Sequence, residues 1–250
     1  MTGWLAEDLP SGGRKEEMDM SQYINQCVGN VINTLTMGYA FEKGDPKFQR
    51  LYRMLEETFR HFASPECLLF LNHHPWVRHI PLFGRFGYTR LMELVKGQRD
   101  FFKEEIAEHR KKFDPNAEPK DYTDAFLQEV DRRRKAGEPL SHFTEKQLIG
   151  SLTSLWQAGL DTTVTTLLWA ILFMMHHPDV QEKCRSEILQ LLRVRREKQH
   201  DGVLKFSDRN DTPYTTATLM EIQRRGNIIQ SGPGRKLMSD VELGGYRRVR

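Results

Sequence analysis

The sequence predicts a mainly α-helical protein with a small β segment near its C-terminus. Apolar residues recur at intervals of three and four through most of the 250-residue chain, which is the period of an amphipathic helix. Pro, Gly, Asp and Asn separate these periodic segments, and such residues favour turns. Residues 237–246 instead alternate and contain Gly244-Gly245, which favours a strand and a hairpin turn.

Composition places the chain among globular proteins. Hydrophobic residues make up 38% and charged residues 28%, as is typical of a folded domain. The net charge of +3 is too small to indicate nucleic-acid binding. The longest apolar run, residues 167–175, is shorter than the ~18 residues of a membrane span. Residues 1–15 show no signal-peptide pattern, because acidic residues and a Ser-Gly-Gly turn interrupt them.

The first helices are predicted from apolar spacing. Between Asp19 and Gly38 the apolar positions expected to face inward are Ile24, Cys27, Val28, Val31, Ile32 and Leu35. Gly44-Asp45-Pro46 opens a second helix, whose apolar face extends to Phe62. A third helix is expected over residues 88–113, and a short amphipathic helix around Phe126 follows it.

Residues 64–87 break this helical rhythm. Their prolines and aromatic residues are Pro65, Phe70, Pro75, Trp76, Pro81, Phe83 and Phe86. An apolar connection of this kind lines a pocket, meets a membrane surface or packs on its own core. His73, His74 and His79 also lie here, but no carboxylate or thiolate stands at ligand spacing, so no metal site is predicted.

The longest predicted helix covers residues 144–177. Thr144 and Gln147 form a capping-box pattern at its start, and Pro178 ends it and begins the next helix. Its centre, residues 158–163 (A-G-L-D-T-T), contains an acid and poor helix formers. Gly permits close approach to the backbone, and a Thr hydroxyl can bond the carbonyl four residues back. These residues leave two interpretations open: a functional groove, or a kinked core helix with its polar side chains in solvent.

The C-terminal part is predicted to contain one exposed connection and one more helix. Residues 193–200 form a charge run and residues 201–213 are polar and turn-rich, so together they resemble a single exposed connection. The last helix begins near Tyr214 and places Glu221 and Arg224 one turn apart. An acid–base pair at this spacing is usually a weak surface contact of a few tenths of a kcal/mol.

Three segments in this order resemble the cytochrome P450 family. Residues 158–163 match the A/G-G-x-D/E-T-T pattern of that family's long central helix, and residues 221–224 (E-I-Q-R) match its E-x-x-R helix. Residues 240–246 resemble the strand pair that follows. The likeness is to the microsomal animal group, which includes drug-metabolising and nematode enzymes, and it extends over nearly the whole chain. We therefore expect residues 1–250 to form a single partial P450-like domain.

The resemblance implies haem-thiolate monooxygenation, in which one atom of dioxygen enters an apolar organic substrate. Thr162 would hydrogen-bond the iron-bound oxygen and Asp161 would help to relay protons to it. Ala158 and Gly159 would allow close approach to haem and substrate. Arg235 falls near the position of a propionate-binding residue.

The resemblance also implies a structural pair, partners and a location. Glu221 and Arg224 would be a buried ion pair supporting the proximal side of the haem. Electrons would come from NADPH-cytochrome P450 reductase, with cytochrome b5 as a further partner, at the cytoplasmic face of the endoplasmic reticulum membrane. No nucleic-acid partner is expected, because the basic runs at residues 132–135 and 193–198 are not interleaved with aromatic residues.

The sequence departs from the family pattern at its haem ligand. The family places a cysteine in a Phe-x-x-Gly-x-Arg-x-Cys-x-Gly loop, and none of the three cysteines, Cys27, Cys67 and Cys184, has that context. They form no C-x-x-C pair and suit a reducing compartment. The N-terminal anchor helix of the family is also not found, so we expect peripheral membrane contact or a cytosolic chain. We expect no metal ligand and no monooxygenase activity from this chain as written. The alternative is a haem-free, non-catalytic helical fragment that is unstable or binds a partner.

Overall fold

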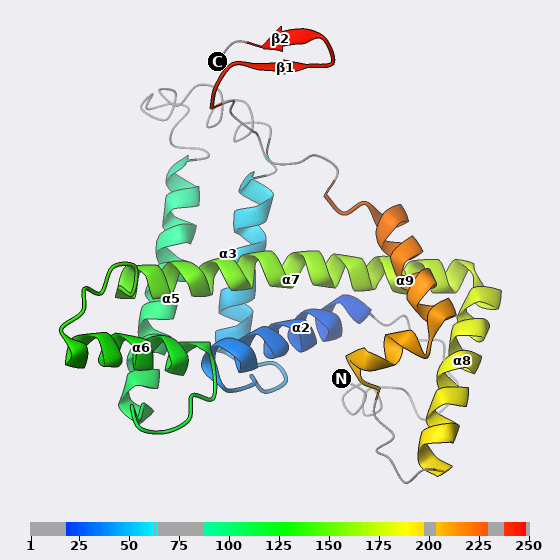
Figure 1. Ribbon diagram of the computed structural model, residues 1–250, viewed down its shortest axis with the longest axis horizontal. Coiled ribbons are helices and arrows are strands. Elements are labelled where there is room, and N and C mark those ends of the chain that lie inside the picture. The colour runs from blue at the N-terminus through cyan, green and yellow to red at the C-terminus, as the bar shows by residue number, and fades with distance from the viewer. Residues whose placement is uncertain (1–18, 63, 65–87, 198–203, 230–237, 249–250) are drawn as a thin grey trace. The chain divides into compact units, whose positions relative to one another are not determined.

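The computed structural model describes residues 19–62, 64, 88–197, 204–229 and 238–248 of the chain. Figure 1 shows helices joined by connections, with one short hairpin. The helices are α2 (Met20–Met37), α3 (Pro46–Phe62), α5 (Tyr88–Lys112), α6 (Tyr122–Ala136), α7 (Glu145–His176), α8 (Pro178–Glu197), the 3-10 helix η3 (Phe206–Asn210) and α9 (Pro213–Gly226). The predicted mainly α-helical class is confirmed.

The chain divides into two compact units, Met1–Leu168 and Trp169–Arg250. The boundary lies within α7. The first unit holds α2, α3, α5, α6 and most of α7, and the second holds the end of α7 together with α8, η3, α9 and the hairpin. The single domain expected over residues 1–250 stays a prediction.

Helix ends follow the sequence signals. The Asp19 carboxylate accepts a 2.9 Å hydrogen bond from the backbone N–H of Ser21 at the start of α2, and Gly38 ends this helix with φ 76°. The backbone N–H of Gln147 donates to the Thr144 hydroxyl over 3.2 Å at the start of α7, which confirms this half of the capping box. These caps satisfy backbone groups that a helix end leaves without intrahelical partners.

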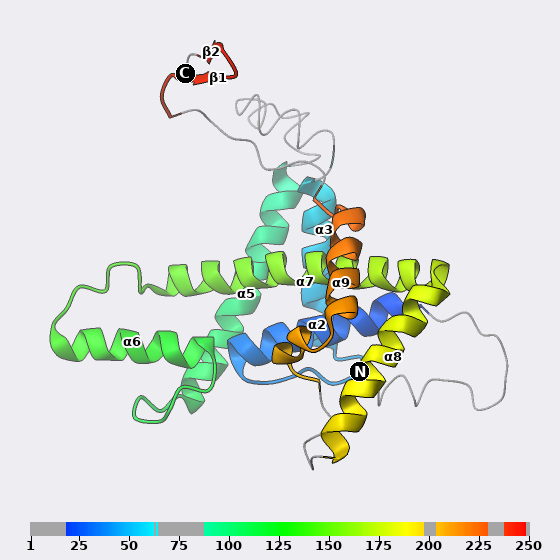
Figure 2. The same cartoon turned by 45° about the vertical axis from the view of Figure 1, so that its right-hand side comes forward.

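The core of the first unit lies where α7 meets α2, α3 and α5. Helices α3 and α5 run side by side in both views (Figures 1 and 2). The largest fully buried apolar side chains are Leu51, Leu55, Phe102, Ile106, Leu148, Leu152 and Trp156. A Cβ added to Gly29 of α2 would stand 2.4 Å from Cε2 of Phe48. Glycine at this position therefore lets the phenyl ring pack directly on the α2 backbone.

A buried glutamine joins three of these helices. The Gln98 side chain of α5 has no exposed surface, and its amide donates to the Thr58 hydroxyl of α3 over 2.8 Å and to the Met54 carbonyl over 3.2 Å. Its carbonyl oxygen accepts a 2.9 Å bond from Gln157 of α7. A buried amide is tolerated because both its ends have partners.

The buried face of α2 differs from the predicted one. Val31 and Leu35, expected to face inward, are 61% and 67% exposed. Asn30 instead exchanges two hydrogen bonds with the backbone of Phe41, donating over 3.0 Å and accepting over 2.8 Å. The connection after α2 needs partners for its backbone groups, and amide side chains of α2 supply them. This requirement turns polar residues inward at the expense of apolar ones.

The end of α2 meets the start of α6. The Thr123 hydroxyl donates a 2.7 Å hydrogen bond to the carbonyl oxygen of Thr36, across 87 residues of sequence. Asp121, the N-cap of α6, lies against Gly38, where an added Cβ would stand 2.6 Å from its Oδ2. Thr123 is fully buried, so this hydrogen bond satisfies a carbonyl in the last turn of α2 away from water.

In the second unit, α8 fixes the start of α9. The Glu187 carboxylate accepts hydrogen bonds from the backbone N–H of Tyr214 over 2.9 Å and of Thr215 over 2.7 Å. Pro213 occupies the first turn of α9, where its missing N–H costs nothing. An acid from a neighbouring helix thus takes the place of a local N-cap side chain.

The exposed connection predicted for residues 193–213 is wrong in part. Helix α8 continues to Glu197, and η3 forms before α9. The Asp208 side chain in η3 is only 5% exposed, and it accepts hydrogen bonds from Arg195 of α8 and from the backbone N–H of Lys205. The correction has a physical reason: a charged side chain can be buried when an opposite charge and backbone donors meet it.

The predicted strand and hairpin turn are confirmed near the C-terminus. Strands β1 (Val241–Leu243) and β2 (Tyr246–Arg248) pair antiparallel, with Val241 opposite Arg248. Gly244 and Gly245 connect them with φ 59° and 81°. Two successive residues with positive φ form the hairpin turn whose twist matches the strands, and glycine adopts it without strain.

Candidate functional site

The residues singled out at the centre of α7 share one face of the helix. Ala158, Asp161 and Thr162 stand at positions i, i+3 and i+4, which lie above one another on a helix surface. Ala158 and Asp161 are exposed, whereas Trp156 and Leu160 on the opposite side are 0% and 3% exposed. The helix therefore has a core face and an open face that carries a carboxylate and a hydroxyl.

Threonine hydroxyls on this helix bond to its own backbone. The Thr162 hydroxyl donates to the Ala158 carbonyl oxygen over 2.6 Å, and the Thr166 hydroxyl donates to the Thr162 carbonyl over 2.7 Å. The predicted bonding to the carbonyl four residues back is confirmed. Such bonds compete with the regular ladder and loosen it locally.

Electrostatics around Asp161 favour its protonated form. Partial burial raises the pKa of Asp161, and the carboxylate of Glu56 on α3 raises it further. Tyr52 of α3 belongs to the same surroundings: burial, Glu56 and Asp161 all raise its pKa. The Tyr52 hydroxyl also accepts a 3.0 Å bond from the amide of Asn25. Glu56 and Tyr52 of α3 thus lie close enough to Asp161 to interact with it electrostatically.

Gly159 lies beside α2. A Cβ at this position would stand 3.2 Å from Cδ1 of Ile32. The close approach that this glycine permits in the structure is thus one between α7 and α2. Approach to a haem or substrate, expected for Ala158 and Gly159, stays a prediction.

Glu221 and Arg224 pair as their spacing predicts, but in solvent. The guanidinium donates two hydrogen bonds of 2.7 Å to the two carboxylate oxygens, and these bonds lower the pKa of Glu221. The side chains are 52% and 72% exposed. The burial expected for this pair is therefore not found among the described residues. Arg235 lies outside the described residues.

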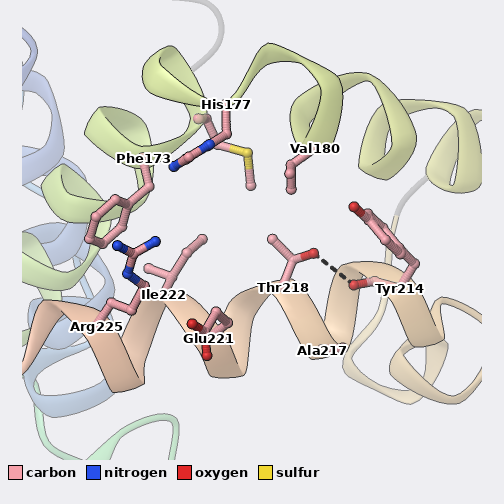
Figure 3. A pocket seen from close by; sticks show the side chains of 10 residues that line it. Phe173, His177, Val180, Tyr214, Ala217, Thr218, Glu221, Ile222 and Arg225 are labelled. Atoms are coloured by element: carbon pink, nitrogen blue, oxygen red, sulfur yellow. Dashed lines mark hydrogen bonds between the residues drawn. The ribbon is translucent and has the colours of Figure 1, made fainter.

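A small apolar cavity lies in the second unit between the end of α7, α8 and α9 (Figure 3). Its volume is 350 Å³, and it is lined by Phe173, Met174, His177, Val180, Tyr214, Ala217, Thr218, Glu221, Ile222 and Arg225. The Arg225 guanidinium lies 5.5 Å from the centre of the Phe173 ring. The sequence did not predict this cavity, since its lining combines three elements and only Glu221 among the lining residues is a fixed residue of a motif.

Residues 5–247 match the family model described as Cytochrome P450. The chain belongs to the cytochrome P450 family. Among its P450 relatives, Cytochrome P450 2J2 of Homo sapiens is 36% identical over 89% of this chain. Cytochrome P450 2D6 of Homo sapiens is 35% identical over 90% of it, and Cytochrome P450 2A11 of Oryctolagus cuniculus is 31% identical over 90%. The chain spans 42–43% of the length of these relatives.

The two P450 motifs fall in different units of the structure. Residues 158–163 belong to the first unit, and residues 221–224 belong to the second. The structure brings Ala158, Asp161 and Thr162 together on α7, and it brings Glu221 to Arg224 on α9. Each half of the P450 signature is thus a local arrangement within one helix.

One P450 helix is also long and apolar enough for a bilayer. By length and composition alone α7 could cross a membrane, although its N-terminal half packs in the core of the first unit. Toward its C-terminus it exposes Leu167, Leu172 and Met175, by 42%, 41% and 73%. The apolar run in the sequence was too short to indicate a membrane-spanning length, because Gly159, Asp161 and the threonines that follow interrupt the apolar residues of α7.

Proposed function

We propose that the protein carrying this chain is a haem-thiolate monooxygenase, and that the open face of α7 forms its oxygen side. One observation carries the proposal: the exposed Ala158 and Asp161 and the half-buried Thr162 share one helix face, opposite the buried Trp156 and Leu160. A small residue beside a hydroxyl and a carboxylate suits a flat group that must come close to the helix. Family membership supports the same assignment.

The described residues fit one side of a haem. Ala158 leaves room for a planar group, and Thr162 and Asp161 add polar atoms beside it. The described thiols give no comparable support for an axial ligand: Cys27 is half-buried on α2, and the buried Cys184 thiol stands 3.6 Å from the Thr218 hydroxyl between α8 and α9. Bound haem would supply oxygen activation. On this face of α7, Thr162 would donate a hydrogen bond and Asp161 would supply a proton.

Two side chains would manage hydrogen bonds and protons. The Thr162 hydroxyl can turn from the Ala158 carbonyl to a bound ligand, exchanging one hydrogen bond of about 1 kcal/mol for another. Asp161 holds a proton on its carboxylate at higher pH than an ordinary aspartate, because burial and Glu56 raise its pKa. A carboxyl group in this state can donate a proton to a neighbouring hydroxyl as that hydroxyl passes its own proton to a bound ligand, and the carboxylate can then regain a proton from solvent.

Substrate and partners follow from the family. An apolar small molecule would be the substrate, with dioxygen as co-substrate. NADPH-cytochrome P450 reductase and cytochrome b5 would deliver electrons, at the cytoplasmic face of the endoplasmic reticulum membrane. The exposed apolar side chains near the end of α7 support an apolar neighbour for this helix.

Haem titration of the 250-residue chain tests the placement. Ala158→Trp should weaken haem binding at least tenfold, which corresponds to about 1.4 kcal/mol, since the indole fills the open face. Thr163→Trp is the matched control, because residue 163 is exposed and lies about 140° away around the helix axis. Equal affinities of the two variants would contradict the placement of haem on this face.

A spectrum of the same complex tests the axial ligand. We expect the reduced, haem-loaded chain to give no thiolate-type Soret band with carbon monoxide, because none of its cysteines has the family's ligand pattern. A thiolate-type band would show that Cys27, Cys67 or Cys184 binds the iron. Absence of any saturable haem binding would favour the non-catalytic helical fragment.

A further inference from the structure

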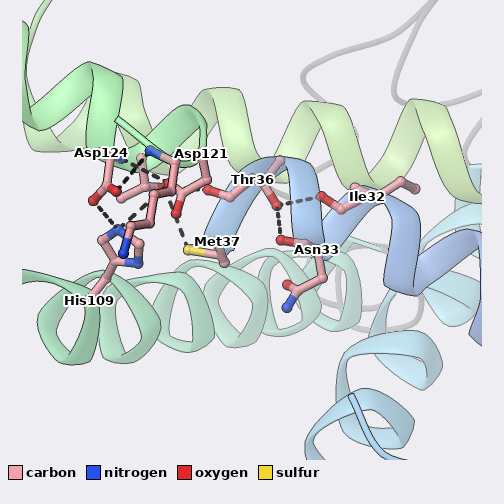
Figure 4. A network of polar contacts seen from close by, with 9 residues as sticks. Ile32, Asn33, Thr36, Met37, His109, Asp121 and Asp124 are labelled. Atoms are coloured by element: carbon pink, nitrogen blue, oxygen red, sulfur yellow. Dashed lines mark hydrogen bonds and ion pairs between the residues drawn. The ribbon is translucent and has the colours of Figure 1, made fainter. Parts of the chain in front are cut away.

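Three side chains of types that can bind a metal ion meet where α5 ends and α6 begins (Figure 4). His109 comes from the last turn of α5, Asp121 is the N-cap of α6, and Asp124 lies in its first turn. The Nε2 atom of His109 is 2.8 Å from Oδ1 of Asp124 and 3.6 Å from Oδ1 of Asp121. One ligand atom from each residue lies within 4.8 Å of the other two.

The backbone holds both carboxylates in place. Oδ1 of Asp121 accepts a 2.9 Å bond from the N–H of Asp124, and Oδ2 of Asp124 accepts a 3.2 Å bond from the N–H of Lys120. These bonds leave Oδ1 of Asp124 directed at the imidazole. The positive-φ Gly38 packs against the other oxygen of Asp121. Backbone donors that fix ligand oxygens are the outer-shell partners of many metal sites.

The separations suit a tetrahedral ion. Zinc binds histidine nitrogen and carboxylate oxygen at about 2.0–2.1 Å, so two ligand atoms of a tetrahedral site stand ~3.3 Å apart. The two observed separations, 2.8 Å and 3.6 Å, lie on either side of that value. Shifts of a few tenths of an ångström would therefore bring the imidazole nitrogen to tetrahedral spacing from each carboxylate oxygen, and the two carboxylate oxygens already lie within 4.8 Å of each other.

Burial and charge favour a cation here. The His109, Asp121 and Asp124 side chains are 16%, 3% and 18% exposed, so the cluster is sheltered yet reachable from solvent. The Asp121 carboxylate is almost wholly buried, so its negative charge has little contact with water. A bound divalent ion would compensate that loss of solvation. One imidazole and two carboxylates leave a fourth position for water.

We propose that His109, Asp121 and Asp124 bind a Zn²⁺ ion that fastens the end of α5 to the start of α6. This site lies on helices that carry neither P450 motif, so it is independent of the proposed haem chemistry. The ion would act structurally: it stabilises the folded chain by an amount that grows with the logarithm of the free Zn²⁺ concentration above the dissociation constant, because the unfolded chain does not bring the three ligands together.

Calorimetric titration of Zn²⁺ into the chelator-treated 250-residue chain tests the site. One ion should bind per chain, and the midpoint of thermal unfolding should rise with Zn²⁺ concentration. His109→Gln and Asp124→Asn should each weaken binding by roughly 100-fold or more, since changes to outer-shell groups alone cost 10–100-fold. His142→Gln is the matched control, because His142 is exposed and outside the cluster, and it should bind as the unsubstituted chain does.

Cobalt provides a spectroscopic check. Co²⁺ in the same site should give the visible absorption of tetrahedral coordination, and Asp124→Asn should remove it. Asparagine keeps a side-chain oxygen for the α6 start, so this variant decides the question if His109→Gln fails to fold. No saturable Zn²⁺ binding, or equal binding by the chain and Asp124→Asn, would overturn the proposal.

Discussion

The Thr162 hydroxyl at the centre of α7 has one proton to donate, and that proton already takes part in a hydrogen bond. Thr162 donates it to the Ala158 carbonyl, while Asp161 one residue earlier stands near a second acid, Glu56. Sequence motifs located both residues, since their types and spacing are local properties. The environment of Asp161 was not predictable, because Glu56 belongs to another helix more than a hundred residues earlier.

The raised pKa of Asp161 has a consequence for stability. Its pKa is higher in the folded than in the unfolded chain, so ionisation of Asp161 destabilises the fold above that pKa. Asp161→Asn should therefore increase the free energy of unfolding at neutral pH, and the gain should vanish as the pH falls below the ordinary aspartate value of ~3.9. Urea unfolding across this range measures it.

Glu221→Gln provides a comparison in which the expected change in the free energy of unfolding at neutral pH has the opposite sign. Its hydrogen bonds from Arg224 lower the pKa of Glu221 in the folded chain, so that pair stabilises the fold at neutral pH and its contribution is lost as the pH falls. The substitution should lower stability slightly, because both side chains are exposed. A loss of stability in Asp161→Asn at neutral pH would contradict the account of Asp161.

At the scale of elements, helices were predictable because a 3.6-residue period is written into each segment. Partners were not. The inward turn of Asn30 depends on backbone groups at Phe41, and the burial of Asp208 depends on Arg195. Polar side chains that bond to distant groups can therefore be buried at positions that an apolar period does not predict. Packing in the core of the first unit also depends on distant residues, since Gly29 of α2 lies beside Trp156 of α7.

Two glycine substitutions separate packing from helix propensity. Gly29→Ala should destabilise the chain, because the new methyl would stand 2.4 Å from the Phe48 ring and crowding a core costs about 1–3 kcal/mol. Gly150→Ala in α7 meets nothing within 4 Å and should stabilise it by up to about 1 kcal/mol. Chemical denaturation measures both. Equal effects of the two substitutions would show that Gly29 is not tightly packed.

Trp156 offers a second test of the core. Its side chain is fully buried, and among the described residues its indole N–H has no hydrogen-bond partner. Trp156→Phe should cost about 1 kcal/mol, because the lost contacts are partly offset by removal of an unpaired donor. Trp156→Ala should cost about 3–5 kcal/mol. Urea unfolding measures both losses of stability. A loss in Trp156→Phe as large as that in Trp156→Ala would indicate that the indole N–H has a partner in solution.

At the scale of the whole molecule, the two units bury very different amounts of their chain. In the second unit the buried residues among those described are Cys184, Asp208, Thr212 and Ile222, whereas the first unit contains nearly the whole apolar core. The sequence predicts similar apolar faces for the helices of both units. It does not reveal which segments cover each face. Stability should therefore be distributed unevenly along the chain.

Hydrogen exchange followed by mass spectrometry measures this distribution. Peptides from α8 and α9 should exchange at least tenfold faster than peptides from α3, α5 and the first half of α7, since few buried contacts oppose local opening in the second unit. Peptides spanning residues 169–176 provide an internal comparison, because they continue the same helix past the unit boundary. Uniform protection along the chain would contradict the difference between the units.

The bond between Thr123 and Thr36 bears on the order of folding. It closes a loop of 87 residues, so its entropic cost must be met before the bond contributes. We expect it to be absent from the transition state. Thr123→Val should then accelerate unfolding while leaving the folding rate nearly unchanged, a low φ-value in stopped-flow kinetics. A slowed folding rate would instead place the joining of α2 to α6 among the earliest events of folding.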